Sequence, residues 1–546
     1  MTTAVTTTRP EAGAGPSGST LAGTGALIRF ILRRERIRIP LWLLGIVALV
    51  AVQAAAVVEQ YPTQADLDAV AETAGSDPAF LAMVGPDYAL NTVGGNTVWQ
   101  ISAFGTIIVA LMSMSLVGRN TRAEEESGRA ELVRATVVGR HAQLTAALVV
   151  VAAVNLVMGT LVALSLLGQD LPVAGSVAFG AALAGGGLVF TAVTAVGAQV
   201  TESTRAAYGI TAAVMGGSFA LRAAGDVGNG VLSWLSPIGW VQQVRSFADE
   251  RWWVLLLLVA TAAVLVAVAY ALVSRRDLAA GLVRPRPGPA AASAAMGGPL
   301  GFAFRLHRGT LIGWTAGMFV GGLVLGSVGN DVQDIMGGNE EINDIFTQAG
   351  GASIAESYLG SVLLMMAIVG AGYAVSAALR LSSEEAAGRA EPLLATALSR
   401  WRWVGSHAVV ALVGSVVVLA ALGLGAGAAY AATTGDDGAV LRLLGAALTH
   451  APAVWVVAGA TVALFGLVPR FAAAAWAVLG LGFVVLMFGP LLDLPDWLRA
   501  LSPFDHSPQV PAVDLTVGPL GWLLAVAALL LALGLTAFRR RDVITT

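Results

Sequence analysis

The sequence predicts an all-α polytopic membrane protein in which twelve transmembrane helices form two parallel six-helix repeats. The chain has 546 residues, 56% of them hydrophobic and 12% charged, a composition typical of multi-pass membrane proteins. Twelve apolar runs come close to or exceed the roughly 20 residues that a helix needs to cross a bilayer. A charged segment also occurs twice, at residues 124–140 and 384–400, which indicates an internal duplication.

The chain begins with a polar segment and continues with the first transmembrane half. Residues 1–24 are small and polar with proline and glycine, so we expect a disordered cytoplasmic tail. The first half covers residues 25–273, and its apolar runs lie at about 39–58, 98–117, 145–167, 176–200, 207–221 and 252–273.

The second half follows a linker at residues 274–301, whose proline, glycine and alanine content predicts a flexible cytoplasmic tether. This half covers residues 302–538, and residues 539–546 form a cytoplasmic C-terminal tail. Its apolar runs lie at about 311–329, 358–379, 404–432, 443–468, 471–492 and 519–537.

The distribution of arginine predicts the orientation of the spans. All 31 basic residues are arginine, and a cytoplasmic N-terminus places 26 of them in cytoplasmic segments and five outside. Such a bias fits the positive-inside rule, so we expect both termini in the cytoplasm. Because six spans per half is an even number, both halves have the same orientation and form parallel repeats.

The fifth run of the first half is unusual. It loses its apolar character at Arg222, and residues 231–244 then become apolar and aromatic again around Pro237 and Gly239. Two interpretations remain open: a broken or re-entrant helix on the outer side, or a loop that lies on the lipid headgroups through its tryptophans.

The first outer segment of each half is long and acidic, at residues 59–97 and 329–357. Each contains a stretch with helical character, at residues 77–85 and 342–350. Small-residue patterns such as Gly322-x-x-x-Gly326 allow close helix packing.

The chemistry of an energy-coupled carrier or of an enzyme is missing. With the boundaries above, no Asp, Glu or Arg falls within a span, so proton and ion relays have no candidate residues. His407 and His450 lie near span ends and are expected to be packed or interfacial. The chain has no lysine, which a phosphate-binding loop requires, so ATP hydrolysis would need a separate polypeptide. We expect no catalytic residue, metal site or cofactor in this chain.

The duplicated segments are the most informative feature, and we call residues 124–140 knob 1 and residues 384–400 knob 2. In each, paired glutamates precede Gly-Arg-Ala-Glu and then a short apolar stretch. Gly128 and Gly388 are expected to end the emerging helix, and Pro392 predicts that a new helix begins near Glu391. Apolar residues that share a helical face are Val133, Val137 and Val138 in knob 1, and Leu393, Ala397 and Leu398 in knob 2. A docking site for a cytoplasmic partner and a plain structural turn are both compatible with this pattern.

The sequences EEESGRAELVRATVVGR and EEAAGRAEPLLATALSR resemble the coupling helix of ABC-2 type membrane subunits of ATP-binding-cassette (ABC) transporters. Alanine replaces the usual Ser/Thr at residues 130 and 390, and no proline follows Thr136 or Thr396. The double-length, lysine-free chain resembles actinobacterial permeases described as exporters of polyketide antibiotics, of the tetronasin type. The resemblance implies ATPase-docking residues at Glu124, Glu125, Gly128, Arg129, Glu131, Arg140, Glu384, Glu385, Gly388, Arg389, Glu391 and Arg400.

The same resemblance implies a multi-pass permease of the bacterial plasma membrane that exports hydrophobic or amphipathic compounds, such as antibiotics, polyketides and other drugs. Two copies of a separate ABC ATPase would bind ATP and Mg, and no nucleic-acid partner is expected. Residues assigned to the substrate path by the resemblance are Trp99, Phe104, Met112, Met114, Met215, Phe219, Met365, Met366, Tyr373, Met487 and Phe488. For each of these, helix packing or lipid contact is the alternative. A twelve-helix secondary drug carrier and an ABC transporter of lipid or cell-envelope polymer are the alternative functions.

Overall fold

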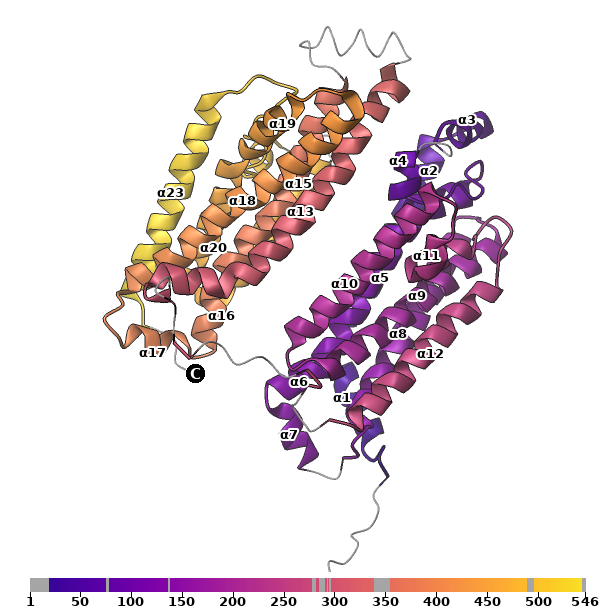
Figure 1. The fold of residues 1–546 in the computed structure, drawn as a ribbon, viewed down its shortest axis with the longest axis horizontal. Helices are drawn as coiled ribbons and strands as arrows, with labels where there is room; N and C mark the ends of the chain where they lie inside the picture. The colour runs from indigo at the N-terminus through magenta and orange to yellow at the C-terminus, as the bar shows by residue number, and fades with distance from the viewer. Residues whose placement is uncertain are drawn as a thin grey trace, which may run out of the picture. The chain divides into compact units, whose positions relative to one another are not determined.

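The computed structural model describes residues 19–74, 78–135, 138–276, 281–283, 290–291, 293, 296–337, 354–488 and 495–542. The chain divides into two compact units, Met1–Pro287 and Gly288–Thr546. Within the described residues every regular element is a helix, and each unit is considered by itself below (Figure 1).

Unit 1 consists of long helices joined by short ones. Figure 1 shows α6 and α7 at one end of this unit and α3 and α4 at the opposite end. Its elements are α1 (Thr24–Arg34), α2 (Arg38–Gln60), α3 (Gln64–Ala74), α4 (Pro78–Met83), α5 (Val93–Asn120), α6 (Arg122–Glu126), α7 (Arg129–Arg134), α8 (Ala142–Leu167), α9 (Val173–Val200), α10 (Thr204–Val227), η1 (Leu232–Leu235), α11 (Pro237–Gln243) and α12 (Trp253–Val273).

Unit 2 repeats the succession of long helices, and Figure 1 shows α16 and α17 at one end of the unit. Its elements are α13 (Pro299–Gly337), α15 (Ile354–Ala378), α16 (Arg380–Ala386), α17 (Ala390–Leu394), α18 (Arg400–Thr434), α19 (Ala439–Leu448), α20 (Ala451–Leu467), η3 (Pro469–Ala474), α21 (Ala475–Phe488), α22 (Asp496–Arg499) and α23 (Val517–Arg540).

The all-α polytopic prediction is confirmed. Eleven helical segments of the described residues are long and apolar enough to cross a membrane. They match the predicted runs of both halves except the fifth run of the first half, at 207–221, which lies in α10 and does not meet that standard. The stretch at 77–85 contains α4 as expected, whereas residues 342–350 lie outside the described residues.

The α10 helix extends beyond the fifth predicted run. Helix α10 does not stop at Arg222 but continues to Val227, so a buried arginine and Asp226 lie inside it and form an ion pair at 3.4 Å. Both charges lie beyond residue 221, where the fifth predicted run ends, so the predicted run itself contains no charge. After α10 the chain forms η1 and α11, and α11 is buried against α5, α9 and α10. Of the two interpretations, the broken helix fits this burial and the surface loop does not.

Small residues allow the helices of unit 1 to pack closely around α9. A Cβ atom added at Gly180 of α9 would lie 2.2 Å from the carbonyl oxygen of Gly159 in α8, so only glycine fits at this crossing. Polar residues within the helices are satisfied locally, since Thr191 and Thr194 donate to carbonyl oxygens one turn earlier at 2.8 and 2.7 Å. Helix α9 contacts α5, α8 and α12 and forms the centre of the unit.

The linker begins close to unit 1. The backbone amides of Leu282 and Val283 donate to the carbonyl oxygens of Gln199 and Val200 at the end of α9, at 3.4 and 3.0 Å. Residues 281–283 of the predicted tether thus lie beside α9.

Candidate functional site

Both knobs form the predicted helix, glycine corner and short helix. In knob 1, α6 ends before Gly128, whose φ of 74° is left-handed, and α7 follows. In knob 2, Gly388 has a φ of 69°, and α17 begins at Ala390 with Pro392 in its first turn. The new helices are shorter than the apolar pattern suggested. Leu393 and Leu398 still pack against the core of unit 2, whereas Val137 and the side chain of Val133 lie outside the described residues.

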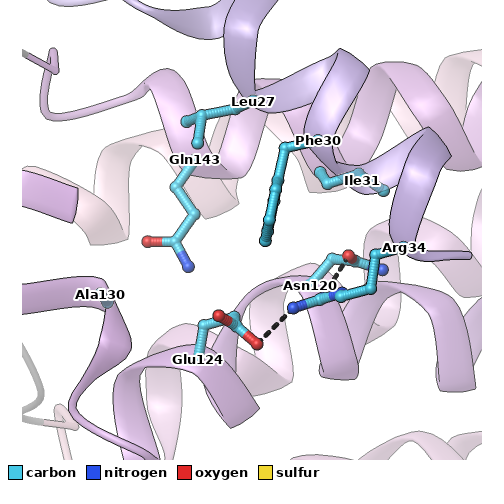
Figure 2. Close-up of a pocket in the computed structure, with 8 residues that line it drawn as sticks. All are labelled: Leu27, Phe30, Ile31, Arg34, Asn120, Glu124, Ala130 and Gln143. Carbon is cyan, nitrogen blue, oxygen red and sulfur yellow. Dashed lines mark hydrogen bonds and ion pairs between the residues drawn. The ribbon is translucent and has the colours of Figure 1, made fainter. Parts of the chain in front are cut away.

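Figure 2 shows how the first glutamate of knob 1 is held. The guanidinium of Arg34 in α1 forms an ion pair with Glu124. The same group donates to Asn120 Oδ1 at 2.5 Å and to the carbonyl oxygen of Arg119 at 3.1 Å. Arg34, Asn120 and Glu124 line a small cavity of about 30 Å³, which apolar residues of α1 also border. It has room for about one water molecule, so it is a joint between α1 and the knob rather than a substrate site.

The first glutamate of knob 2 is held by its own neighbours. Glu384 is buried and pairs with Arg380 at 2.6 Å and with Arg389 at 2.7 Å. The hydrogen bond to Glu384 raises the pKa of Arg389, so the pair stays ionised.

The second glutamate of each knob binds an arginine that follows the last long helix of the same unit. In unit 1 the two carboxylate oxygens of Glu125 accept from Arg276 at 2.8 and 2.6 Å. In unit 2 those of Glu385 accept from Arg541 at 2.7 and 2.6 Å. We call these two bidentate pairs the arginine clasps, Glu125–Arg276 and Glu385–Arg541.

The last arginine of each knob also binds the segment at the end of the last long helix of its unit. Arg140 donates to the carbonyl oxygens of Val273 and Arg276 at 2.8 and 2.9 Å. Arg400 donates to those of Arg541 and Arg539 at 2.6 and 3.3 Å. A cation at the C-terminal end of a helix satisfies carbonyl groups that lack a partner within the helix.

These contacts divide the proposed docking residues into two groups. Glu124, Glu125, Glu384 and Glu385 make ion pairs within their own unit, and Glu125, Glu384 and Glu385 are also buried. Arg140 is exposed but binds the segment at the end of α12 described above. The other exposed charges among the proposed docking residues are Arg129 and Glu131 on knob 1 and Arg389 and Glu391 on knob 2, although Arg129 and Arg389 also pair with Glu124 and Glu384. Beside them Leu132 is 74% exposed. We call these exposed residues the outer faces of the knobs.

The structure brings some of the predicted path residues together. Phe104 of α5 and Phe219 of α10 have ring centroids 6.3 Å apart, and Met215 packs in the same cluster. In unit 2, Met366 borders a groove of about 480 Å³ with Trp314 and other residues of α13 and α15. Both surfaces are apolar and contain flexible methionine side chains, as expected of a site that binds organic molecules.

The other predicted path residues whose side chains the structure describes do not belong to these two surfaces. Met112 and Tyr373 are wholly buried in the cores of their units, and Trp99 is buried with its indole donating to the carbonyl oxygen of Gly85 at 2.8 Å. Met114 and Met365 are partly exposed. The side chains of Met487 and Phe488 lie outside the described residues.

Comparison with known proteins identifies the family. The chain is 46% identical over 530 residues to the multidrug efflux system permease protein Rv1217c of Mycobacterium tuberculosis (strain ATCC 25618 / H37Rv), and the match covers 96% of each chain. A family model described as the C-terminal domain of multidrug efflux system permease Rv1217c matches residues 296–539. The chain belongs to this family of efflux permeases. It is a multi-pass membrane permease, as the predicted architecture requires.

Sequence reasoning missed several residues that build the knobs of this efflux permease. Helix α1 and its Arg34 were not recognised, although the amphipathic sequence of residues 24–34 was a signal for a helix. Arg276 and Arg541 were counted only as positive charges, because nothing local indicates which glutamate they bind.

The two histidines expected to be packed, His407 and His450, are buried in this efflux permease. His407 is buried and its ring lies in hydrogen-bonding distance of His307, at 2.9 Å. His450 is buried and contacts the hydroxyl of Ser507 at 2.7 Å.

Proposed function

We propose that this efflux permease is the fused membrane subunit of an ABC exporter for hydrophobic and amphipathic compounds, with both termini in the cytoplasm. Two copies of a separate ABC ATPase, each binding ATP and Mg, would dock on the outer faces of the two knobs. The observation that carries the proposal is the repeated knob, which presents Arg and Glu at matching positions in both units. The name of the Mycobacterium tuberculosis relative supports drugs as cargo.

The substrate class is proposed from the chemistry of the available surfaces. The cluster around Phe104 and Phe219 is made of aromatic, methionine and aliphatic side chains. The groove beside Met366 combines Trp314, Met318 and Val369 with three glycines and a threonine. Such surfaces bind flat or flexible apolar molecules, and polyketide antibiotics have this chemistry.

Charge reversal on the outer faces tests the proposal. The variant Glu131→Arg/Glu391→Arg places repulsive charge on both knobs without touching the internal ion pairs, and Glu72→Arg on α3 is an exposed control. We expect the double variant to lose copurification of a co-expressed candidate ABC ATPase and drug-stimulated ATP hydrolysis, while Glu72→Arg behaves like wild type. Equal assembly of wild type and double variant would contradict docking at the knobs.

One observation favours the secondary-carrier alternative: Arg222 and Asp226 form a buried ion pair in α10, and a carrier driven by ions needs buried charges. Uptake into inverted vesicles separates the two mechanisms. ATP-dependent uptake of a fluorescent drug supports the exporter, whereas uptake driven by a proton gradient without ATP supports the carrier. Movement of a labelled lipid in place of the drug would favour the lipid-transporter alternative.

A further inference from the structure

The arginine clasps join parts of the chain that are far apart in sequence. Glu125 and Arg276 are separated by 151 residues, and Glu385 and Arg541 by 156. Each glutamate lies on the short helix that follows the second long helix of its unit. Arg541 directly follows the last helix of unit 2, and Arg276 lies three residues after the end of the last helix of unit 1. The clasp therefore fixes the end of α12 to α6 in unit 1, and the end of α23 to α16 in unit 2.

Further contacts at each clasp add two more long helices of the same unit. Arg276 Nε donates to Gln199 Oε1 of α9 at 2.8 Å, and Arg541 Nη2 donates to the carbonyl oxygen of Phe465 in α20 at 3.4 Å. Arg140 and Arg400 add the starts of α8 and α18 through the carbonyl contacts already described. Four long helices of each unit thus meet at one arginine.

The surroundings of the two clasps differ, although the clasps themselves are the same. In unit 1 a second arginine, Arg122, donates to Glu125 at 2.5 Å. In unit 2 the guanidinium of Arg541 lies over the rings of Phe465 and Phe538, at 5.0 and 4.9 Å. What the two units share is the bidentate Glu–Arg pair and the arginine that holds the adjoining carbonyl groups.

A contribution to stability alone does not explain why both units contain an arginine clasp. A buried ion pair gains little stability over well-packed apolar side chains of similar volume, because both charges lose their hydration. A bidentate Arg–carboxylate pair does fix distance and orientation, since two parallel hydrogen bonds leave little rotational freedom. The side chains of the unit 1 pair are 6% exposed, which shields the bond from water.

We propose that the arginine clasps make the last helix of each unit move with its knob, so that Arg276 and Arg541 are positioning residues for transport. This inference rests on the proposed function, in which the ATPases act on the knobs. A displacement of α6 or α16 would then reach α12 or α23 directly, without passing through the loops between the intervening helices.

The test uses the full-length permease in complex with its ATPase, reconstituted into liposomes. The variant Arg276→Gln/Arg541→Gln removes both clasps, and Arg275→Gln/Arg540→Gln changes the exposed neighbouring arginines as a matched control. We expect drug transported per ATP hydrolysed to fall about tenfold in the clasp variant, within the range usual for coupling between distant sites. Basal hydrolysis and copurification of the ATPase should stay near wild type.

Two further variants keep the inference falsifiable. The exchange Glu385→Arg/Arg541→Glu restores opposite charges in unit 2 and should recover part of the coupling that Arg541→Glu alone loses. Arg541→Lys, which keeps the charge but loses the bidentate geometry, should give intermediate coupling.

The outcomes separate the inference from the proposed function. Clasp variants that unfold at lower temperature but transport as much drug per ATP as wild type would show a purely structural role and overturn the inference. Wild type that neither binds an ATPase nor transports with ATP would refute the proposed function, and the inference with it.

Discussion

The guanidinium of Arg222 is wholly buried and is held by the end of another helix. It donates to the carbonyl oxygens of Leu81, Ala82 and Met83 in α4 at 3.3, 2.7 and 3.0 Å. Its carboxylate partner Asp226 also accepts from the hydroxyl of Ser233 at 2.6 Å. This single side chain thus ties α4 to α10.

We expect Arg222→Met to destabilise the permease strongly. The change leaves three carbonyl groups and a buried carboxylate without their cation, and breaking a buried pair in this way costs about 3–5 kcal/mol. Thermal unfolding of the purified protein measures the effect, with the exposed Arg205→Met as control. Adding Asp226→Asn should recover part of the loss. Equal unfolding temperatures for Arg222→Met and Arg205→Met would contradict this role.

At the scale of elements, glycine decides how closely α13 approaches α18. A Cβ atom at Gly322 or Gly326 would lie 2.3 Å from the carbonyl oxygen of Leu422 or Ala426, and backbone atoms cannot turn away as a side chain can. At Gly313, on the same helix, an added Cβ meets nothing within 4 Å. The small-residue pattern at Gly322 and Gly326 is therefore a packing surface, as the sequence predicted.

Gly326→Val should accordingly lower the unfolding temperature of the permease, whereas Gly313→Val should leave it near wild type. Forcing larger side chains into a packed contact costs about 1–3 kcal/mol. The same pair of variants in detergent can be followed by loss of the monodisperse peak on heating. A larger decrease of the unfolding temperature for Gly313→Val than for Gly326→Val would contradict the close contact of α13 with α18 at Gly326.

The sequence predicts those elements of this fold that depend on residues close together in the chain. Long apolar runs predict the spanning helices, and Gly128 and Gly388 predict the knob corners, because a left-handed residue ends a helix whatever surrounds it. Helix α10 continues past Arg222 because α4 and Asp226 neutralise the charge. The burial of Arg222 depends on α4, about 140 residues earlier in the chain. The arginines that bind Glu125 and Glu385 are 151 and 156 residues away. Neighbouring residues therefore predict neither feature.

At the scale of the whole molecule, the proposed function requires both knobs on the cytoplasmic side. The chain has no cysteine, so single cysteines can report the side of the membrane. The residues Leu132 on knob 1 and Asp437 in the α18–α19 loop are both exposed. They lie on opposite sides of the membrane in the predicted topology.

We expect a membrane-impermeant maleimide to label Asp437→Cys in right-side-out vesicles and Leu132→Cys only in inverted ones. Labelling after detergent solubilisation, when both sites are accessible, serves as the control for reactivity. The opposite pattern would place the knobs outside the cell and remove them from any cytoplasmic ATPase.

The arginine clasps also have a consequence for biogenesis. Translation delivers Glu125 to the membrane 151 residues before Arg276, and Glu385 precedes Arg541 by 156. During that interval each half lacks the arginine that closes its clasp, and a half interrupted before its last long helix leaves this glutamate without its bidentate partner. Completion of each half is thus marked by the formation of one ion pair.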